Sequence, residues 1–126
     1  MSQYYTPGQV AERFDVSIDT LRYYERIGVL NPIERASSGH RRYRAADVEL
    51  LDLVRCLRDT GMPIADLRRF ADLVRAGDAT VPERLALLAE HESHITDHIA
   101  VLQSRQQHIR DKIAYYRSLS DEVSSR

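Results

Sequence analysis

The sequence predicts a mainly helical protein: several short helices come first, and one long helix that pairs with a second copy follows them. Three features predict this. Helix-start and helix-stop residues bracket short amphipathic segments in residues 1–78, and a basic segment interrupts those helices. From residue 79 onward, apolar residues recur at a spacing of seven. We therefore expect one domain over 1–78 and a coiled-coil dimerisation helix with a frayed tail over 79–126.

The stretch from Ser17 to Gly28 predicts a short helix with two different sides. Ser17 can accept the free N–H groups of a first turn, and Gly28 can adopt the positive φ that ends a helix. Apolar residues at spacings of three form a side that can pack on a core: Ile18, Leu21, Tyr24 and Ile27. The exposed sides carry groups able to bind phosphates and base edges: Thr20, Arg22, Tyr23 and Arg26.

The segment before it predicts another short helix. Thr6, Pro7 and Gln9 form an N-cap, a first-turn proline and a capping box, and residues 10–14 supply an apolar side. Asp15 and Val16 then form a tight turn. Two helices joined in this way make a helix-turn-helix whose second helix reads DNA, although a generic helical hairpin has the same pattern.

A small basic wing is predicted over residues 29–43. Val29-Leu30 has the character of a short strand, Ser37-Ser38-Gly39 of a turn, and His40–Tyr43 of a returning strand. Residues 35–44 contain four arginines and no acidic residue, although the whole chain has a net charge of −1. Arginine donors match phosphate geometry, so DNA backbone contacts are expected here. The alternative is an ordinary solvated charge run.

Three helices should follow the wing. Residues 45–60 are apolar around much of the circumference, with Arg44 standing where a better cap is expected. Residues 64–76 form the next helix, and Thr80–Glu83 predicts a capping box for the last one.

The heptad pattern of the last helix predicts a coiled coil. A helix this long cannot bury its apolar seam against short helices, so it requires a second copy. The expected dimer contacts are Leu85, Leu88, Ile95, Ile99, Leu102, Ile109, Ile113 and Tyr116. His91, His94 and His98 lie along one side, but a polar coiled-coil flank is favoured over a metal site.

Composition limits the remaining classes of protein. A single cysteine, Cys56, excludes an internal disulfide framework and fits a reducing cytoplasm. We find no signal-peptide pattern and no run long enough to span a membrane, so we expect no membrane partner. Neither a cofactor nor a metal ion is predicted.

The runs Thr-Leu-Arg-Tyr-Tyr-Glu-Arg-Ile-Gly-Val-Leu, Gly-His-Arg-Arg-Tyr and Gly-Met-Pro-Ile resemble the MerR family of bacterial transcription regulators. The resemblance implies a winged helix-turn-helix, an antiparallel homodimer, a palindromic promoter that is distorted on activation, and RNA polymerase as a partner. The expected DNA contacts are Ser17, Thr20, Arg22, Tyr23, Tyr24, His40, Arg41, Arg42, Tyr43, Arg55 and Arg58. Two departures stand out: His40 replaces the family's usual tyrosine, and Asp19 lies where a base is common.

Cys56 allows two interpretations. Free cysteine is often a buried apolar filler. Alternatively, the thiol is a sensor, because Arg55 and Arg58 lie nearby in sequence and positive charge favours a thiolate. The run that begins at Cys56 also resembles the single-cysteine MerR branch that responds to aldehydes, nitrosothiols or oxidants.

Two rival functions remain at this stage. One is an architectural or excisionase-like protein that bends DNA without an effector. The other is a thiol enzyme using Cys56, which is disfavoured because no base or oxyanion arrangement is visible near this residue. We therefore expect a regulator and not an enzyme.

Overall fold

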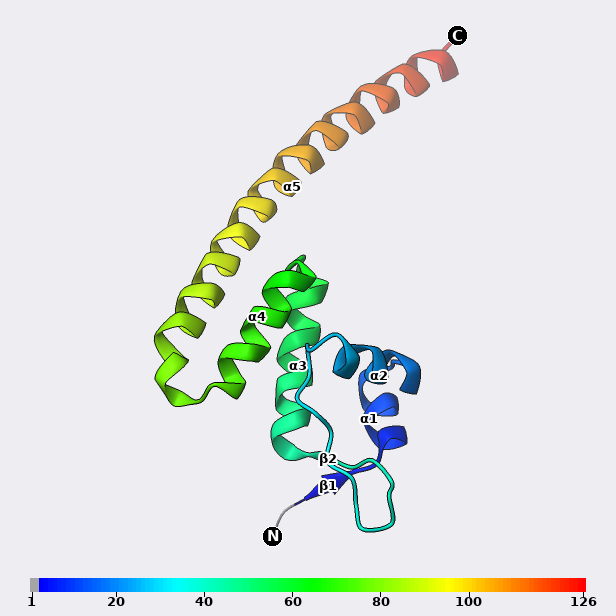
Figure 1. Ribbon diagram of the computed structural model, residues 1–126. Helices are drawn as coiled ribbons and strands as arrows, with labels where there is room; N and C mark the ends of the chain where they lie inside the picture. The colour runs from blue at the N-terminus through cyan, green and yellow to red at the C-terminus, as the bar shows by residue number, and fades with distance from the viewer. Residues whose placement is uncertain (1–2) are drawn as a thin grey trace. The chain divides into compact units, whose positions relative to one another are not determined.

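The computed structural model describes residues 3–126, and their contacts divide into two compact units. The first, which we call the head, ends at Leu88, and the second runs from Ala89 to Arg126. The mainly helical fold that the sequence predicts is confirmed (Figure 1). In chain order the elements are β1 (Tyr4–Tyr5), α1 (Pro7–Phe14), α2 (Ile18–Arg26), β2 (Tyr43–Arg44), α3 (Ala45–Asp59), α4 (Ile64–Arg75), the 3-10 helix η1 (Asp78–Thr80) and α5 (Val81–Ser124).

The helix-turn-helix forms through the local chemistry that the sequence indicates. Thr6 and Gln9 make the capping box of α1: the Gln9 N–H donates to Thr6 Oγ1 at 3.1 Å, and the Thr6 N–H donates to Gln9 Oε1 at 2.9 Å. Asp15 ends the helix in the left-handed conformation, with φ 53°. Ser17 Oγ accepts the Thr20 N–H at 3.0 Å and starts α2. The turn thus fixes the orientation of α2, the reading helix, relative to α1.

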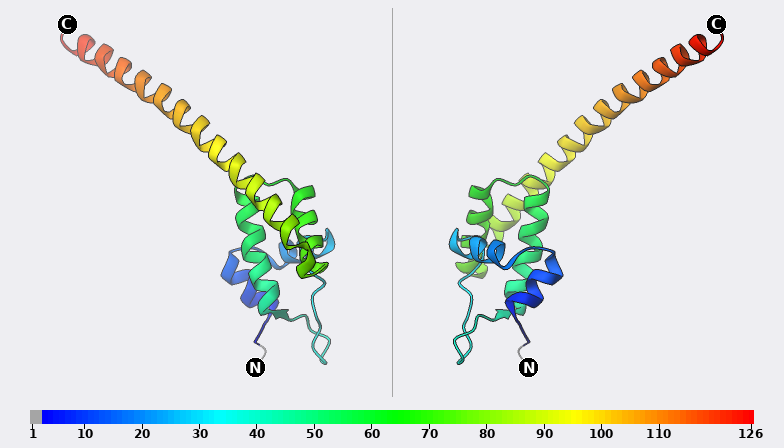
Figure 2. Two further views of the ribbon diagram at one scale, coloured as in Figure 1. Left: turned by 90° about the vertical axis from the view of Figure 1, so that its left-hand side faces the viewer. Right: turned by 90° about the vertical axis from the view of Figure 1, so that its right-hand side faces the viewer.

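The helices of the head share one hydrophobic core, and Figure 2 shows them grouped around α3. Helices α1 to α4 and the turn after α2 contribute side chains that are almost completely buried: Val10, Leu21, Leu30, Leu51, Val54, Leu67 and Ala71. Full burial of one such aliphatic side chain stabilises a fold by about 1.5–3 kcal/mol. The first turns of α5 belong to this core as well, because Leu87 is buried in it.

The strand predicted at Val29-Leu30 is wrong. Both residues are buried, and both backbone N–H groups donate to the carbonyl oxygen of Tyr24, at 3.0 and 3.2 Å. Two adjacent buried residues fit a chain that turns under the core, whereas a half-buried strand alternates its sides. The sheet of the head instead joins β1 to β2, with Tyr4 opposite Arg44 and Tyr5 opposite Tyr43.

The wing, which we define as residues 31–42, extends from the helices as a thin hairpin (Figure 2). An isolated bridge joins Arg35 to Arg41 across it. The turn is closed by the Gly39 N–H, which donates to the Ala36 carbonyl at 2.8 Å, and by the Ala36 N–H, which donates to the His40 carbonyl at 2.8 Å. Gly39 has φ +87°, a conformation that favours glycine.

The weak start predicted for α3 is supported by Asp47. This carboxylate is only 1% exposed and accepts the Arg44 N–H at 2.9 Å, the Arg44 Nε at 3.1 Å and its Nη2 at 3.2 Å. The cap therefore comes from inside the first turn, where a carboxylate also complements the helix dipole.

The capping box predicted for α5 is also wrong. Thr80 belongs to η1 and is already helical, whereas an N-cap residue has an extended backbone. Its hydroxyl lies within hydrogen-bond distance of the carbonyl oxygens of Leu73 and Gly77, at 2.5 and 2.8 Å. Arg84 completes the junction by donating to Thr80 Oγ1 and to the Gly77 carbonyl.

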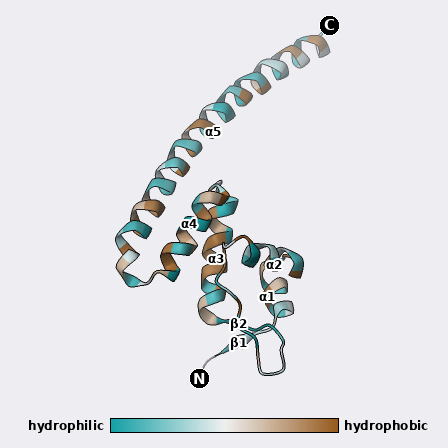
Figure 3. Cartoon of the chain, viewed as in Figure 1, coloured by the Kyte–Doolittle hydropathy of each residue, from teal (hydrophilic) through white to brown (hydrophobic). Residues whose placement is uncertain are grey.

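In the second unit, α5 continues without interruption to Ser124. Hydrophobic residues recur along it among hydrophilic ones (Figure 3). Within residues 3–126, no helix combines the length and the apolar character needed to cross a membrane.

Candidate nucleic-acid interface

The exposed side of the reading helix carries cationic and aromatic groups. Tyr23 is 40% exposed, and the Arg26 guanidinium lies 5.6 Å from the centre of its ring. Arg22 is exposed on the same helix. At the start of the helix, Ser17 Oγ and Thr20 Oγ1 lie 2.9 Å apart and are hydrogen-bonded. These groups place hydrogen-bond donors on the exposed side of α2.

Tyr24 faces the opposite way, into the core, and is 5% exposed. Its hydroxyl accepts a hydrogen bond from Arg58 Nη1, and the Arg58 guanidinium also lies 5.8 Å from the centre of its ring. Arg58 belongs to α3, so this contact joins the third helix to the back of the reading helix. Tyr24 and Arg58, both predicted as DNA contacts, therefore also fix the position of α2.

Arg75, on α4, holds the other end of the reading helix. Its Nη2 donates to the Gly28 carbonyl at 3.1 Å, and its Nη1 reaches the Leu30 carbonyl at 3.4 Å and Asn31 Oδ1 at 3.3 Å. It also pairs with Asp72. A cation at the C-terminal end of a helix satisfies carbonyls that have no partner within the helix.

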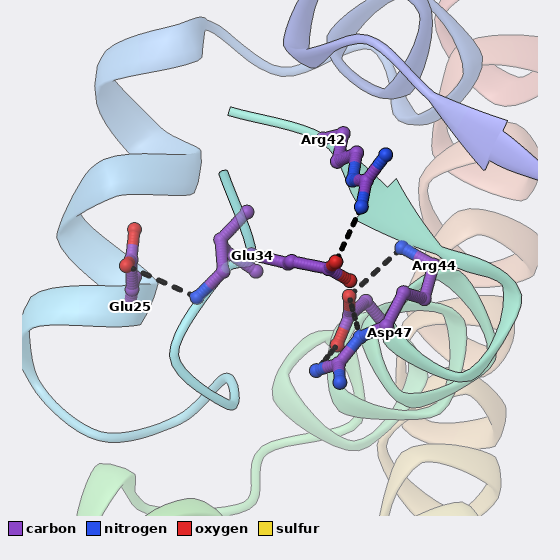
Figure 4. A network of polar contacts seen from close by, with 6 residues as sticks. Glu25, Glu34, Arg42, Arg44 and Asp47 are labelled. Carbon is purple, nitrogen blue, oxygen red and sulfur yellow. Dashed lines mark hydrogen bonds and ion pairs between the residues drawn. The ribbon is translucent and has the colours of Figure 1, made fainter. Parts of the chain in front are cut away.

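Glu25 joins the reading helix to the wing. Its carboxylate pairs with Arg41 and accepts the Ile33 N–H at 3.2 Å (Figure 4 draws the second contact). Both side chains of the pair are mostly covered, 21% exposed for Glu25 and 25% for Arg41. Arg41 is therefore partly neutralised and serves to hold the wing against α2.

The second wing arginine, Arg42, is also paired. It donates to Glu34 (Figure 4), and its guanidinium stacks 4.0 Å from the centre of the Tyr4 ring. The hydrogen bond to the Glu34 carboxylate holds the Arg42 pKa above its usual value. The wing is thus attached to β1 as well as to α2.

Tyr43 begins β2 and lies inside the head, 1% exposed. Burial, followed by the negative charge of Glu25, raises its pKa above the usual value. Because Tyr43 is almost completely buried, it anchors the C-terminal end of the wing to the core of the head.

A concavity of about 460 Å³ lies where α2, the wing and the start of α1 meet. Its lining brings together three predicted DNA-contact residues, Arg22, His40 and Arg41, with residues that the predicted set omits. Arg35 is the important omission within the lining, and Glu25, which pairs with Arg41, is a second omission. Arg35 belongs to the basic run noted in the sequence, whereas Glu25 gave no signal because its partner lies 16 positions away.

The predicted DNA contacts on α3, Arg55 and Arg58, are not among the residues that line this concavity. Arg55 pairs with Asp59 at 3.8 Å, and Arg58 lies 3.9 Å from the same carboxylate. Cys56, between them, is exposed, and its carbonyl accepts the Thr60 hydroxyl at 2.8 Å. Exposure contradicts the interpretation of Cys56 as a buried filler within this chain.

The predicted dimer residues mostly remain uncovered in the single chain. Leu85, Ile99, Leu102, Ile109, Ile113 and Tyr116 are between 44% and 67% exposed, whereas Leu88 packs against the head core. Ile95 is half-buried. Among residues 3–126 no group of three or more His, Cys, Asp or Glu side chains is placed to hold a metal ion.

A docked reading helix beside a basic hairpin defines a winged helix-turn-helix, a class of DNA-binding module. Comparison with known families identifies the particular one. Residues 5–73 match the MerR HTH family regulatory protein, and residues 48–122 match the MerR DNA-binding family. The chain belongs to the MerR family of transcriptional regulators.

Individual relatives agree with this assignment. An HTH-type transcriptional regulator of Haemophilus influenzae is 37% identical over 72% of this chain and 67% of its own length. The HTH-type transcriptional regulator AdhR of Bacillus subtilis is 37% identical over 69% of this chain and 62% of its own. The matched part of the chain thus spans about two thirds or less of these proteins.

Solved structures match over more of the chain. HiNmlR, a MerR family regulator lacking the sensor domain and bound to promoter DNA, aligns with a TM-score of 0.83 at 34% identity, covering 92% of both chains. A MerR family regulator from Bacillus thuringiensis aligns with a TM-score of 0.80 at 33% identity, covering 89% of this chain and 98% of the other. These relatives are transcription regulators, which agrees with the family assignment.

Proposed function

We propose that the protein is a homodimeric regulator that binds a palindromic promoter, distorts the DNA and so makes the promoter usable by RNA polymerase. The observation that carries this proposal is the union, in one head, of an exposed reading helix with a basic wing tied to it by Glu25 and Arg41. The similar HiNmlR is bound to promoter DNA, which supports the choice of ligand.

The proposal of a dimer rests on the apolar residues of α5. Ile99, Leu102 and Ile109 are 49%, 54% and 58% exposed and follow the heptad spacing. A second copy of the helix would cover this seam, as coiled-coil partners do. Two heads related by a two-fold axis would then require two half-sites of inverted sequence.

Activation by DNA distortion follows from the way the wing is attached. An ion pair holds the wing to α2 and a cation–π contact holds it to β1, so the head would grip the backbone as one body. A rigid grip on two half-sites can change the twist between them without touching the intervening bases. Such a protein would act in the cytoplasm, where the promoter is available.

The signal is proposed to reach the protein through Cys56. The thiol is exposed and lies on α3 two positions before Arg58, which holds the reading helix through Tyr24. An adduct on the thiol would therefore form on the helix whose Arg58 helps to position α2. We therefore propose that the protein belongs to the single-cysteine branch that its sequence resembles, and the exposure of the thiol supports this proposal.

Selection of binding sites from a random duplex library, followed by footprinting, tests the proposal. We expect a palindromic consensus and, in transcription with purified polymerase, a change at a promoter carrying it. Bound sites without symmetry would overturn the dimeric reader. Bending at many unrelated sites, with no effect on transcription, would favour the architectural alternative.

A further inference from the structure

We propose that Arg22, Arg35 and His40 form a binding site for one backbone phosphodiester of duplex DNA, and that His40 takes up a proton when this phosphate binds. The inference rests on the proposed function and adds proton-coupled regulation to it. The site is the concavity at the junction of α2, the wing and the start of α1.

The first argument is the balance of charge around the concavity. Its lining holds three arginines and one histidine, and Glu25 is the acid that pairs with one of them, Arg41. Within the part of the chain that the structure describes, neither Arg22 nor Arg35 has a carboxylate partner. Two positive charges therefore remain uncompensated, and a phosphodiester is the anion that the proposed ligand presents.

The second argument is the geometry of the wing turn. Arg35 Nη1 donates to the Gly39 carbonyl at 2.9 Å, which holds this guanidinium against the turn that precedes His40. The backbone bonds between Ala36 and His40, with the left-handed Gly39, fix the path of the turn. Arg22 approaches from the reading helix, so donors from two elements line one space.

The third argument is the chemistry of His40. Its Nδ1 lies 3.1 Å from Ser38 Oγ, which leaves Nε2 as the ring nitrogen for a ligand. The groups that face it are cationic on the wing (Arg35 and Arg41) and on α2 (Arg22), while α1 contributes the uncharged Pro7. A bound phosphate places an anion beside the ring and favours the imidazolium, so binding and protonation favour each other.

Proton linkage gives the site a measurable signature. Phosphate contacts contribute to non-specific binding, so a fluorescent mixed-sequence duplex is a sufficient probe. Between about pH 8 and about pH 6, where an imidazole changes charge, we expect wild-type affinity to rise about threefold to tenfold per head. Calorimetry in buffers of different ionisation enthalpy should show proton uptake on binding.

Substitutions distinguish phosphate binding at this site from a purely structural role of its residues. His40→Gln should remove the proton uptake, and should lower the salt slope at about pH 6 but not at about pH 8. Arg22→Gln and Arg35→Gln should each lower the slope by roughly 0.9 per head at both pH values. His108→Gln, an exposed histidine of α5, and Arg68→Gln, an exposed arginine of α4, serve as matched controls. All variants should keep the wild-type circular dichroism and melting temperature.

The outcomes that would overturn the proposal are distinct. If His40→Gln kept the wild-type pH dependence, or if both arginine variants behaved like Arg68→Gln, the site would be wrong while DNA binding stood. If inorganic phosphate alone at matched ionic strength produced the same proton uptake, the site would be one for free anions. Absence of any duplex binding by the wild type would overturn the proposed function together with this site.

Discussion

At the scale of single residues, the head uses buried polar side chains to position its exposed ones. Tyr24, Tyr43 and Asp47 are each at most 5% exposed, yet each supports an element of the candidate interface or next to it. Tyr24 lies behind the reading helix, Tyr43 beneath the wing, and Asp47 at the start of α3. From sequence, Tyr24 and Tyr43 were grouped with their exposed neighbours because a tyrosine suits both settings equally well.

Tyr43 makes stability depend on alkaline pH. Its pKa is raised by burial, so the neutral phenol stabilises the fold below about pH 10, and this contribution is lost as the pH rises further. We expect the free energy of unfolding to fall by up to about 1.4 kcal/mol per pH unit above about pH 10 from this group. Tyr43→Phe should remove that part of the fall in urea unfolding experiments. Tyr115→Phe, at an exposed site, is the control and should not flatten the curve.

Cys56→Ser separates the thiol's chemistry from its packing. Because Cys56 is exposed, the change should alter the free energy of unfolding by no more than about 0.5 kcal/mol. A hydroxyl lacks the nucleophilicity of a thiolate, so the transcriptional response to aldehydes or nitrosothiols should disappear while DNA binding remains. A variant that responds like the wild type in promoter-driven transcription would remove Cys56 as the sensor.

At the scale of elements, the sequence predicts the two helix caps at Thr6 and Ser17 but does not predict pairing between distant segments. The caps at Thr6 and Ser17 formed as predicted because all their atoms lie within one turn of the chain. The sheet was missed because Tyr4 pairs with Arg44, far along the sequence. The sequence also does not predict the partner of Arg41, because Glu25 lies on another element, 16 positions away.

The attachment of α4 to the reading helix gives a prediction for Arg75. Arg75→Ala should leave the carbonyls of Gly28 and Leu30 without this donor and cost about 1–2 kcal/mol of stability, since the side chain is 29% exposed. Duplex affinity should fall as the end of α2 loosens. Arg68→Ala on the same helix provides the comparison. Equal urea midpoints for the two variants would contradict the role given to Arg75.

At the scale of the whole molecule, the proposed dimer can be tested at the apolar seam of α5. Ile99→Asp and Leu102→Asp should each bury an unpaired charge in a paired helix, at a cost of several kcal/mol. We expect monomers in light scattering and loss of binding to palindromic duplexes. Ser104→Asp, on an exposed and polar position of the same helix, should leave the mass unchanged. If a double Ile99→Asp, Leu102→Asp variant kept the mass of a dimer, the proposed dimer interface on α5 would be contradicted.

The pairing of β1 with β2 also bears on the order in which parts of the head fold. During synthesis, Tyr4–Tyr5 leaves the ribosome early, yet its partner Tyr43–Arg44 follows only after α1, α2 and the wing have been made. Strands of two residues share few hydrogen bonds, so they are expected to join late and to open early. Amide hydrogen exchange should therefore be faster at the wing and β1 than in α3. The wing and β1 are therefore expected to be the last part of the head to become ordered.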